Sequence, residues 1–160
     1  MFQVVDATVN DATAIQQLLR ETWKDTYVDH LSQETLDEVY KNWQSIEFIT
    51  SQIENSALYF PLAKEGDELV GLATTYMPED TIVMFRLYVS PRHQRKGIGA
   101  LLLNNVIEHF QGAKKIQLHV EVMNPKGLSF YKKQGFVELK REEENVGNEV
   151  IEVFLMEKPL

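Results

Sequence analysis

The 160-residue sequence contains no cysteine, and this absence removes several chemistries at once. A chain without cysteine forms no disulfides, has no thiol nucleophile and offers no cysteine-based zinc site. The four histidines are too scattered to form a metal-ligand pair such as His-x-x-x-His. They are His30, His93, His109 and His119. We therefore expect a protein that binds no metal.

Long apolar runs are also missing from the sequence. No stretch reaches the length of a membrane span, and residues 1–6 read as a first strand and not as a signal peptide. We expect a cytoplasmic protein with no membrane partner.

Positive charge is scarce, because 16 Lys and Arg stand against 24 Asp and Glu and give a net charge of −8. A nucleic-acid partner requires a basic face, so this balance argues against one. Segment 92–96 differs from the acidic background, since it contains Arg92, Arg95 and Lys96. One basic pocket on an acidic protein suits an anionic cofactor, whereas the overall charge is equally explained by solubility.

The pattern of apolar residues predicts one domain, residues 1–160, with alternating blocks of strands and helices. We expect strands near residues 2–6, 58–64, 69–77, 81–89, 116–122, 136–141 and 150–156. We expect helices near residues 11–23, 32–42, 45–54, 98–110 and 125–134, with Ser32 and Ser45 as caps. Residues 22–31 read as a loop, and Glu142–Glu144 as a solvated hairpin tip. This order predicts a mixed α/β sheet with helices on both faces.

The most informative stretch follows the strand that ends at Val89. A proline and a short basic loop lead to Gly97 and Gly99, which open a helix. The first-turn N–H groups of a helix lack partners and carry partial positive charge, and glycine lets a ligand approach them. The stretch predicts an anion site, most simply for phosphates, with a solvent-exposed turn as the alternative. A dinucleotide fingerprint is disfavoured because Leu102 replaces the third glycine.

Two motifs carry a resemblance to a known family. The first is Gln94-x-x-Gly97-x-Gly99, and the second, about 25 residues further on, runs from Asn124 through Phe130-Tyr131 to Gly135-Phe136. Together they resemble the GNAT superfamily of acyl-CoA-dependent N-acetyltransferases. Gly127 stands where this family usually has alanine, a change between small residues. The order of elements is similar over essentially the whole chain.

The resemblance implies a fold and a cofactor. The fold is a single-domain, mostly antiparallel seven-stranded mixed sheet with a V-shaped splay between the strands ending near Val89 and Val122. Acetyl-CoA would be the co-substrate, with its pyrophosphate on Gln94, Arg95, Lys96, Gly97, Ile98, Gly99 and Ala100. Its pantetheine arm would pair with the main chain of Leu87, Tyr88 and Val89 like an added strand. Asn124 would position the arm, and Tyr131 would lie beside the sulfur.

The resemblance also implies direct attack of a neutral amine on the thioester in a ternary complex. Tyr131 matches the family's general-acid position, although a tyrosine on an amphipathic helix is by itself more simply a core residue. The base stays open between His119 and Glu121, which share one face of a strand. His119 stands where relatives that acetylate protein N-terminal amines often carry Glu, but packing under a helix would also explain it. Phe85 occupies a position where some members carry a catalytic Glu.

The acceptor side is the least determined. Segment 21–27, the two helices after it and the tail 154–160 resemble bacterial spermidine/spermine N-acetyltransferases of the Pai type. Trp23 and Tyr27 would hold a cation, and Phe85 would also lie in the substrate site. Alternatively, Trp23 and Tyr27 are packing residues at a helix end. Asp25, Asp29 and Glu34 would supply negative charge.

A polyamine or other small cationic amine is therefore the first expectation for the acceptor, and a peptide N-terminal amine the second. A non-catalytic acyl-CoA-binding regulatory module is a further alternative. A homodimer is an expectation from the family.

Overall fold

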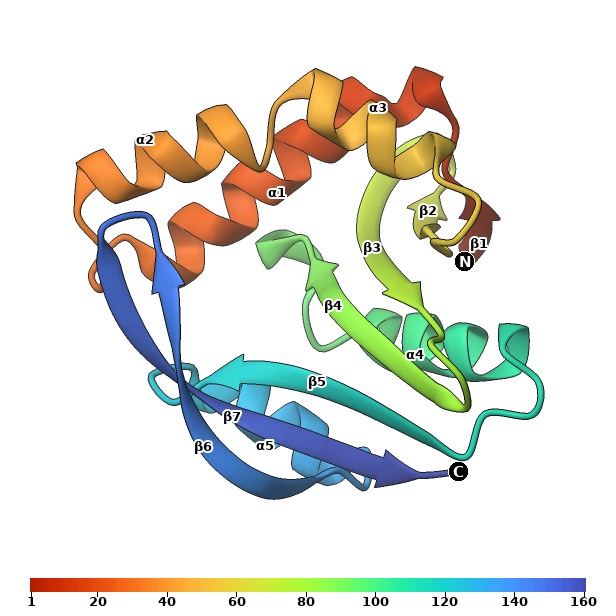
Figure 1. The fold of residues 1–160 in the computed structure, drawn as a ribbon. Helices are drawn as coiled ribbons and strands as arrows, with labels where there is room; N and C mark the ends of the chain where they lie inside the picture. The colour runs from red at the N-terminus through yellow and green to blue at the C-terminus, as the bar shows by residue number, and fades with distance from the viewer.

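The computed structural model describes residues 1–160 and contains one seven-stranded sheet with helices on both faces (Figure 1). The strands are β1 (Phe2–Asp6), β2 (Pro61–Glu65), β3 (Glu68–Tyr76), β4 (Thr81–Val89), β5 (Lys115–Glu121), β6 (Val137–Val146) and β7 (Glu149–Pro159). Their order in the sheet is β1-β2-β3-β4-β5-β7-β6, and only β4 and β5 run parallel. The predicted mixed, mostly antiparallel sheet is thus confirmed.

The helices divide between the two faces of the sheet. They are the 3₁₀ turns η1 (Val9–Asp11) and η2 (Pro91–His93), and the α-helices α1 (Ala12–Tyr27), α2 (Gln33–Asn42), α3 (Ile46–Glu54), α4 (Ile98–His109) and α5 (Pro125–Lys133). Neighbouring residues of β2 explain the layering, because successive side chains of a strand point to opposite faces. Leu62 packs in a cluster with residues of α1 and α3, whereas Ala63 packs with Ile98 and Leu102 of α4. None of the helices has both the length and the apolar character that crossing a membrane requires.

The predicted helix starts at Ser32 and Ser45 are confirmed. The hydroxyl of Ser32 accepts a hydrogen bond from the N–H of Thr35, and that of Ser45 accepts one from Phe48. Each bond satisfies one of the N–H groups that a first helical turn leaves without a partner.

The predicted loop at residues 22–31 is wrong in its first part, because α1 continues to Tyr27. No glycine or proline interrupts residues 12–27, and Thr22 and Tyr27 are buried on the side of the helix that packs on the protein. The apolar stripe therefore extends beyond Trp23, and the two aromatic residues, Trp23 and Tyr27, are one helical turn apart.

The predicted hairpin tip at Glu142–Glu144 is also wrong. These residues are paired in β6 opposite Val153, Glu152 and Ile151 of β7, and the chain turns at Gly147, whose φ is +58°. β6 is an edge strand, so charged side chains can occupy it without burial. The final hairpin is consequently longer than the apolar pattern indicated.

The predicted V-shaped splay is present between β4 and β5, whose ribbons separate from a common end in Figure 1. They pair only through Thr81–Val83 and Lys115–Gln117. Phe85 lies in a bulge, since Thr74 pairs with Arg86 and the next residue, Thr75, pairs with Met84. A bulge bends its strand and increases the local twist, which turns the remainder of β4 away from β5.

Candidate active site

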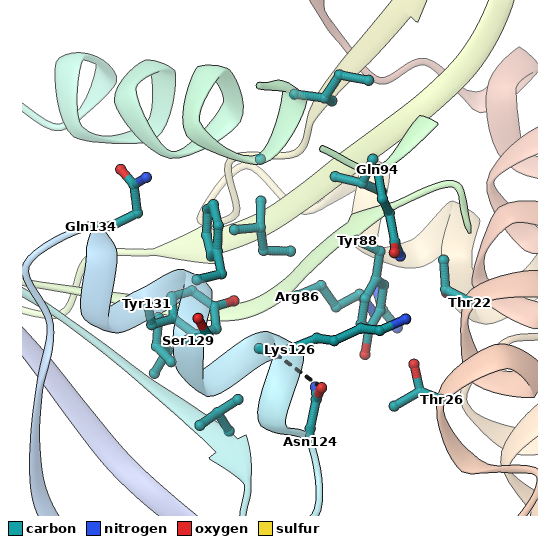
Figure 2. A pocket seen from close by; sticks show the side chains of 18 of the residues that line it. Thr22, Thr26, Arg86, Tyr88, Gln94, Asn124, Lys126, Ser129, Tyr131 and Gln134 are labelled. Atoms are coloured by element: carbon teal, nitrogen blue, oxygen red, sulfur yellow. Dashed lines mark hydrogen bonds between the residues drawn. The ribbon is translucent and has the colours of Figure 1, made fainter. Parts of the chain in front are cut away.

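A cleft of about 910 Å³ occupies the splay. Its walls come from β4, β5, the C-terminal half of α1, the N-terminus of α4 and the helix α5. Figure 2 shows Tyr131 of α5 and Gln134, the residue after this helix, at one side and Thr22 and Thr26 of α1 at the other, with Tyr88 between them. One cleft therefore connects the anion-site loop with the side predicted to receive the acceptor.

The loop before α4 presents free backbone donors. The N–H groups of residues 94–100 donate to no acceptor in the protein, and the first bond of the helix runs from Leu101 N–H to the Gly97 carbonyl. Arg95 and Gly97 both have positive φ, of 63° and 84°. Left-handed residues interspersed in a loop turn successive N–H groups toward one point, an arrangement that binds anions.

The predicted members of this loop mostly line the cleft. Those that do are Gln94, Arg95, Gly97, Ile98, Gly99 and Ala100, whereas the exposed Lys96 does not. Gly99 has a specific steric role, because a Cβ there would lie 3.1 Å from the ring of Phe130 on α5. The second glycine thus lets α4 and α5 approach each other at the cleft.

The cleft-facing edge of β4 is open. Beyond Val83 this strand has a partner only on its β3 side, and Leu87, Tyr88 and Val89 line the cleft. Unpaired strand edges accept an extended ligand through main-chain hydrogen bonds. The three predicted residues therefore present backbone suited to a pantetheine arm.

Asn124 and Tyr131 come from the two ends of α5. The Asn124 side chain caps the helix by accepting a hydrogen bond of 3.0 Å from Gly127 N–H. A Cβ on Gly127 would lie 2.7 Å from Asn124 Nδ2, so glycine is needed for this side-chain position. Tyr131 packs between Phe130 and Phe136, with ring centroids 5.2 and 5.4 Å away. Burial raises its pKa, as do the nearby Tyr88 and Glu121, so its phenol stays protonated at neutral pH.

A second group of aromatic residues lies on the predicted acceptor side of the cleft. The Tyr27 hydroxyl donates a short hydrogen bond to Glu121, and Trp23 Nε1 donates one of 3.2 Å to the Tyr88 hydroxyl. Burial, followed by the charge of Glu121, raises the pKa of Tyr27, and the same two causes raise that of Tyr88 to about 12. Tyr27 lines the cleft and Trp23 does not, so these contacts favour a packing role for Trp23.

His119 also lines the cleft, and the suggestion that it packs under a helix is wrong. Its side chain is 41% exposed, and its Nε2 lies 2.8 Å from Glu142 Oε2. Glu121, two residues further along the same face, already accepts the hydrogen bond from Tyr27. Both candidate bases line the cleft, but the Glu121 carboxylate is already engaged by Tyr27, and this favours His119 as the base.

The structure adds cleft residues that the sequence reasoning missed. Lys126 and Lys133 of α5 line it, and their spacing of seven residues, which places them on one face of a helix, was the available signal. Arg86 of β4 lines it too and donates to Gln52 and to the Trp43 carbonyl. No local pattern marks Arg86, since its partners lie on other elements.

Of the acidic residues proposed for the acceptor, Asp25 lines the cleft, and Asp29 and Glu34 do not.

The fold, the anion-binding loop and the open strand edge define an acyltransferase of the GNAT class. Comparison with known families agrees, because the model of the acetyltransferase (GNAT) family matches residues 13–136. The chain belongs to this family and is an N-acetyltransferase that takes its acetyl group from acetyl-CoA. The free N–H groups of residues 94–100 fit the pyrophosphate of coenzyme A, and the β4 edge fits its pantetheine arm.

Individual relatives show what the chain resembles. A spermidine N(1)-acetyltransferase of Thermoplasma acidophilum is 28% identical over 157 residues, covering 94% of this chain and 92% of that protein. The crystal structure of PaiA N-acetyltransferase from the same organism, in complex with coenzyme A, has a TM-score of 0.87 and 26% identity, and covers 100% of this chain and 99% of that one. The ribosomal protein bS18-alanine N-acetyltransferase of Escherichia coli K12 is 30% identical over 98 residues, covering 60% of this chain and 65% of that protein.

Proposed function

We propose that this enzyme acetylates a primary amine of a polyamine or of another small cationic amine. The observation that carries the proposal is the similarity to a spermidine N(1)-acetyltransferase over 94% of the chain. The charges of the acceptor side support it. Asp25 and Glu121 line the cleft, and Glu142 and Glu144 lie beside His119. The one arginine of β4 in the cleft, Arg86, is engaged by Gln52 and the Trp43 carbonyl.

The proposed mechanism gives binding or catalytic roles to only a few residues. The amide donors of residues 94–100, with Arg95, hold the cofactor, and the main chain of Leu87–Val89 aims the thioester at the acceptor. His119 is the general base that removes a proton from the ammonium form of the amine. Tyr131 is the general acid that protonates the departing thiolate, since its raised pKa keeps the proton available. Glu121 and Tyr27 shape the acceptor site, and Phe85, which is 40% exposed, also lines the cleft.

Thiol release from acetyl-CoA over a panel of amines tests the acceptor class. The sharpest comparison is between 1,4-diaminobutane and 1-aminobutane, because only the diamine has a second amino group and therefore a second positive charge. We expect a kcat/KM at least about tenfold higher for the diamine, equivalent to one charge-assisted contact of about 1.4 kcal/mol. Equal values for the two amines would contradict a site built for polyamines.

A pair of variants tests the contribution of the cleft charge. Asp25→Asn is expected to raise the KM of polyamines several-fold, because it removes a carboxylate from the cleft wall. Asp29→Asn is the matched control, since Asp29 is exposed and lies outside the cleft. Equal effects of the two substitutions would show that only general surface charge matters.

A peptide N-terminal amine is the second candidate acceptor, supported by the 30% identity to the bS18-alanine N-acetyltransferase. A short peptide with an N-terminal alanine belongs in the same amine panel. Turnover of that peptide with no turnover of di- or polyamines would favour this candidate. A cytoplasmic location and a homodimer remain proposals that accompany either acceptor.

A further inference from the structure

Three side chains beside the splay form a continuous chain of contacts across β5, β7 and β6. His119 Nε2 lies 2.8 Å from Glu142 Oε2, and Glu142 Oε1 lies 2.6 Å from Lys140 Nζ. Leu155 of β7 is the register partner of both His119 and Lys140, which places the three strands side by side at this point. Glu142 therefore connects the imidazole of the cleft to a cation on the edge strand.

The chemistry of these groups fixes the direction of each bond. An ionised carboxylate only accepts hydrogen bonds, so the Nε2 of His119 carries a hydrogen and donates it to Glu142. Hydrogen bonds from Lys140 and from His119 lower the pKa of Glu142, which keeps it ionised. In the neutral imidazole the lone pair is then on Nδ1, which has no hydrogen-bond partner within the protein and lies 3.8 Å from Glu144.

We propose that Glu142 is a positioning residue for His119, holding the tautomer whose Nδ1 accepts the proton of the substrate and stabilising the imidazolium that results. This inference rests on the proposed role of His119 as the base. Two protons leave the nitrogen as the C–N bond forms and the C–S bond breaks. The first goes to Nδ1, directly or through water, and then to solvent. The second replaces the proton that Tyr131 gives to the thiolate.

Other charged and titratable groups lie near His119 on β6 or line the same cleft, and the test must separate them from Glu142. They are Lys140 and Glu144 on β6, Glu121 on β5, Asp25 and Tyr27 on α1, Arg86 and Tyr88 on β4, and Lys126 and Tyr131 on α5. The β7 partner of His119, Leu155, is uncharged. Only Glu142 makes a hydrogen bond to the ring.

The experiment compares pH–rate profiles of Glu142→Gln and Glu143→Gln. The second variant is a matched control, because Glu143 is exposed, follows Glu142 in the same strand and points to the opposite face. In Glu142→Gln we expect kcat to fall about tenfold. The ascending limb should move to lower pH, since a neutral amide no longer stabilises the imidazolium. In Glu143→Gln we expect kcat to stay within about twofold of wild type and the ascending limb to stay at its wild-type pH.

Two amines of different basicity separate the enzyme from the substrate. A limb that moves with the amine belongs to the substrate, and a limb that stays belongs to the enzyme. If His119→Ala keeps the enzyme's limb, the base assignment fails and the role of Glu142 fails with it. If His119→Ala removes the limb but Glu142→Gln behaves like Glu143→Gln, only the role of Glu142 is overturned.

A spectroscopic readout tests the tautomer without any turnover. Nitrogen-15 NMR of the histidine-labelled protein at alkaline pH distinguishes Nε2–H from Nδ1–H, and His119→Ala assigns the signal. We expect Nε2–H in wild type and a mixture of tautomers in Glu142→Gln. An Nδ1–H signal in wild type would overturn the proposal.

Discussion

Replacing Tyr131 by phenylalanine removes one hydroxyl group from the wall of the cleft and leaves the ring in place. The contacts to Phe130 and Phe136, at 5.2 and 5.4 Å between centroids, are made by the ring and are retained. The hydroxyl donates no hydrogen bond within the protein, so its loss leaves no buried partner unsatisfied. The free energy of unfolding should therefore change by less than about 0.5 kcal/mol.

The catalytic effect of the same change should be large. A general acid contributes typically about 100-fold or more to the rate, so kcat should fall by at least about 100-fold, equivalent to about 2.7 kcal/mol of activation free energy. The affinity for acetyl-CoA should stay within about threefold, because the proposed cofactor contacts are made mainly by main-chain groups of residues 87–89 and 94–100.

The pH dependence of Tyr131 follows from the sign of its pKa shift. An acid must be protonated to act, and burial raises the pKa of Tyr131 above its ordinary value of 10.0. Any loss of rate caused by its ionisation must therefore have its midpoint above that pH. In the wild type, no descending limb from this group is expected between about pH 7 and 9.

Thiol release measures kcat, isothermal calorimetry with acetyl-CoA measures the affinity for the cofactor, and urea denaturation measures the free energy of unfolding. Tyr59→Phe is the matched control, because the Tyr59 hydroxyl donates a hydrogen bond of 2.6 Å to Asn105 outside the cleft. It should lose about 1 kcal/mol of stability and keep its kcat. A Tyr131→Phe enzyme with unchanged kcat would refute the acid role, and one with a large loss of cofactor affinity would show that the hydroxyl binds the cofactor.

Two further predictions concern stability. Gly127→Ala should lower Tm by about 2–4 °C, because crowding and loss of the Asn124 cap outweigh the gain in helix propensity. A raised Tm in thermal denaturation would show that Asn124 yields without cost. For Asp11, partial burial raises the pKa, but hydrogen bonds from Thr8 and Lys64 outweigh it and bring the pKa below 3.8. Such a pair stabilises the fold above the unfolded pKa and loses that effect as the pH falls through the folded pKa. Lys64→Met should therefore lower Tm at pH 7 but progressively less below pH 3.8, and an equal difference at both pH values would contradict the assignment.

Local signals in the sequence were sufficient for most of the architecture. Ser32 and Ser45 are each followed by a helix because their hydroxyls accept first-turn N–H groups, and this requires only neighbouring residues. The alternation of apolar side chains defines the faces of β5, and the glycines mark the start of α4. The same signals failed where burial competes with composition, at the end of α1 and in the charged edge strand β6.

By itself, the sequence determined the anion-binding loop and the family motif of α5, since both depend on residues close together in the chain. Only the tertiary structure decided what surrounds the reacting groups. Glu142 lies beside His119 because the strand order brings β6 within one strand of β5, with both side chains on the same face of the sheet. Tyr27 reaches Glu121 because α1 extends over the splay. Contacts between residues far apart in sequence follow from strand order and helix length, which no local pattern encodes.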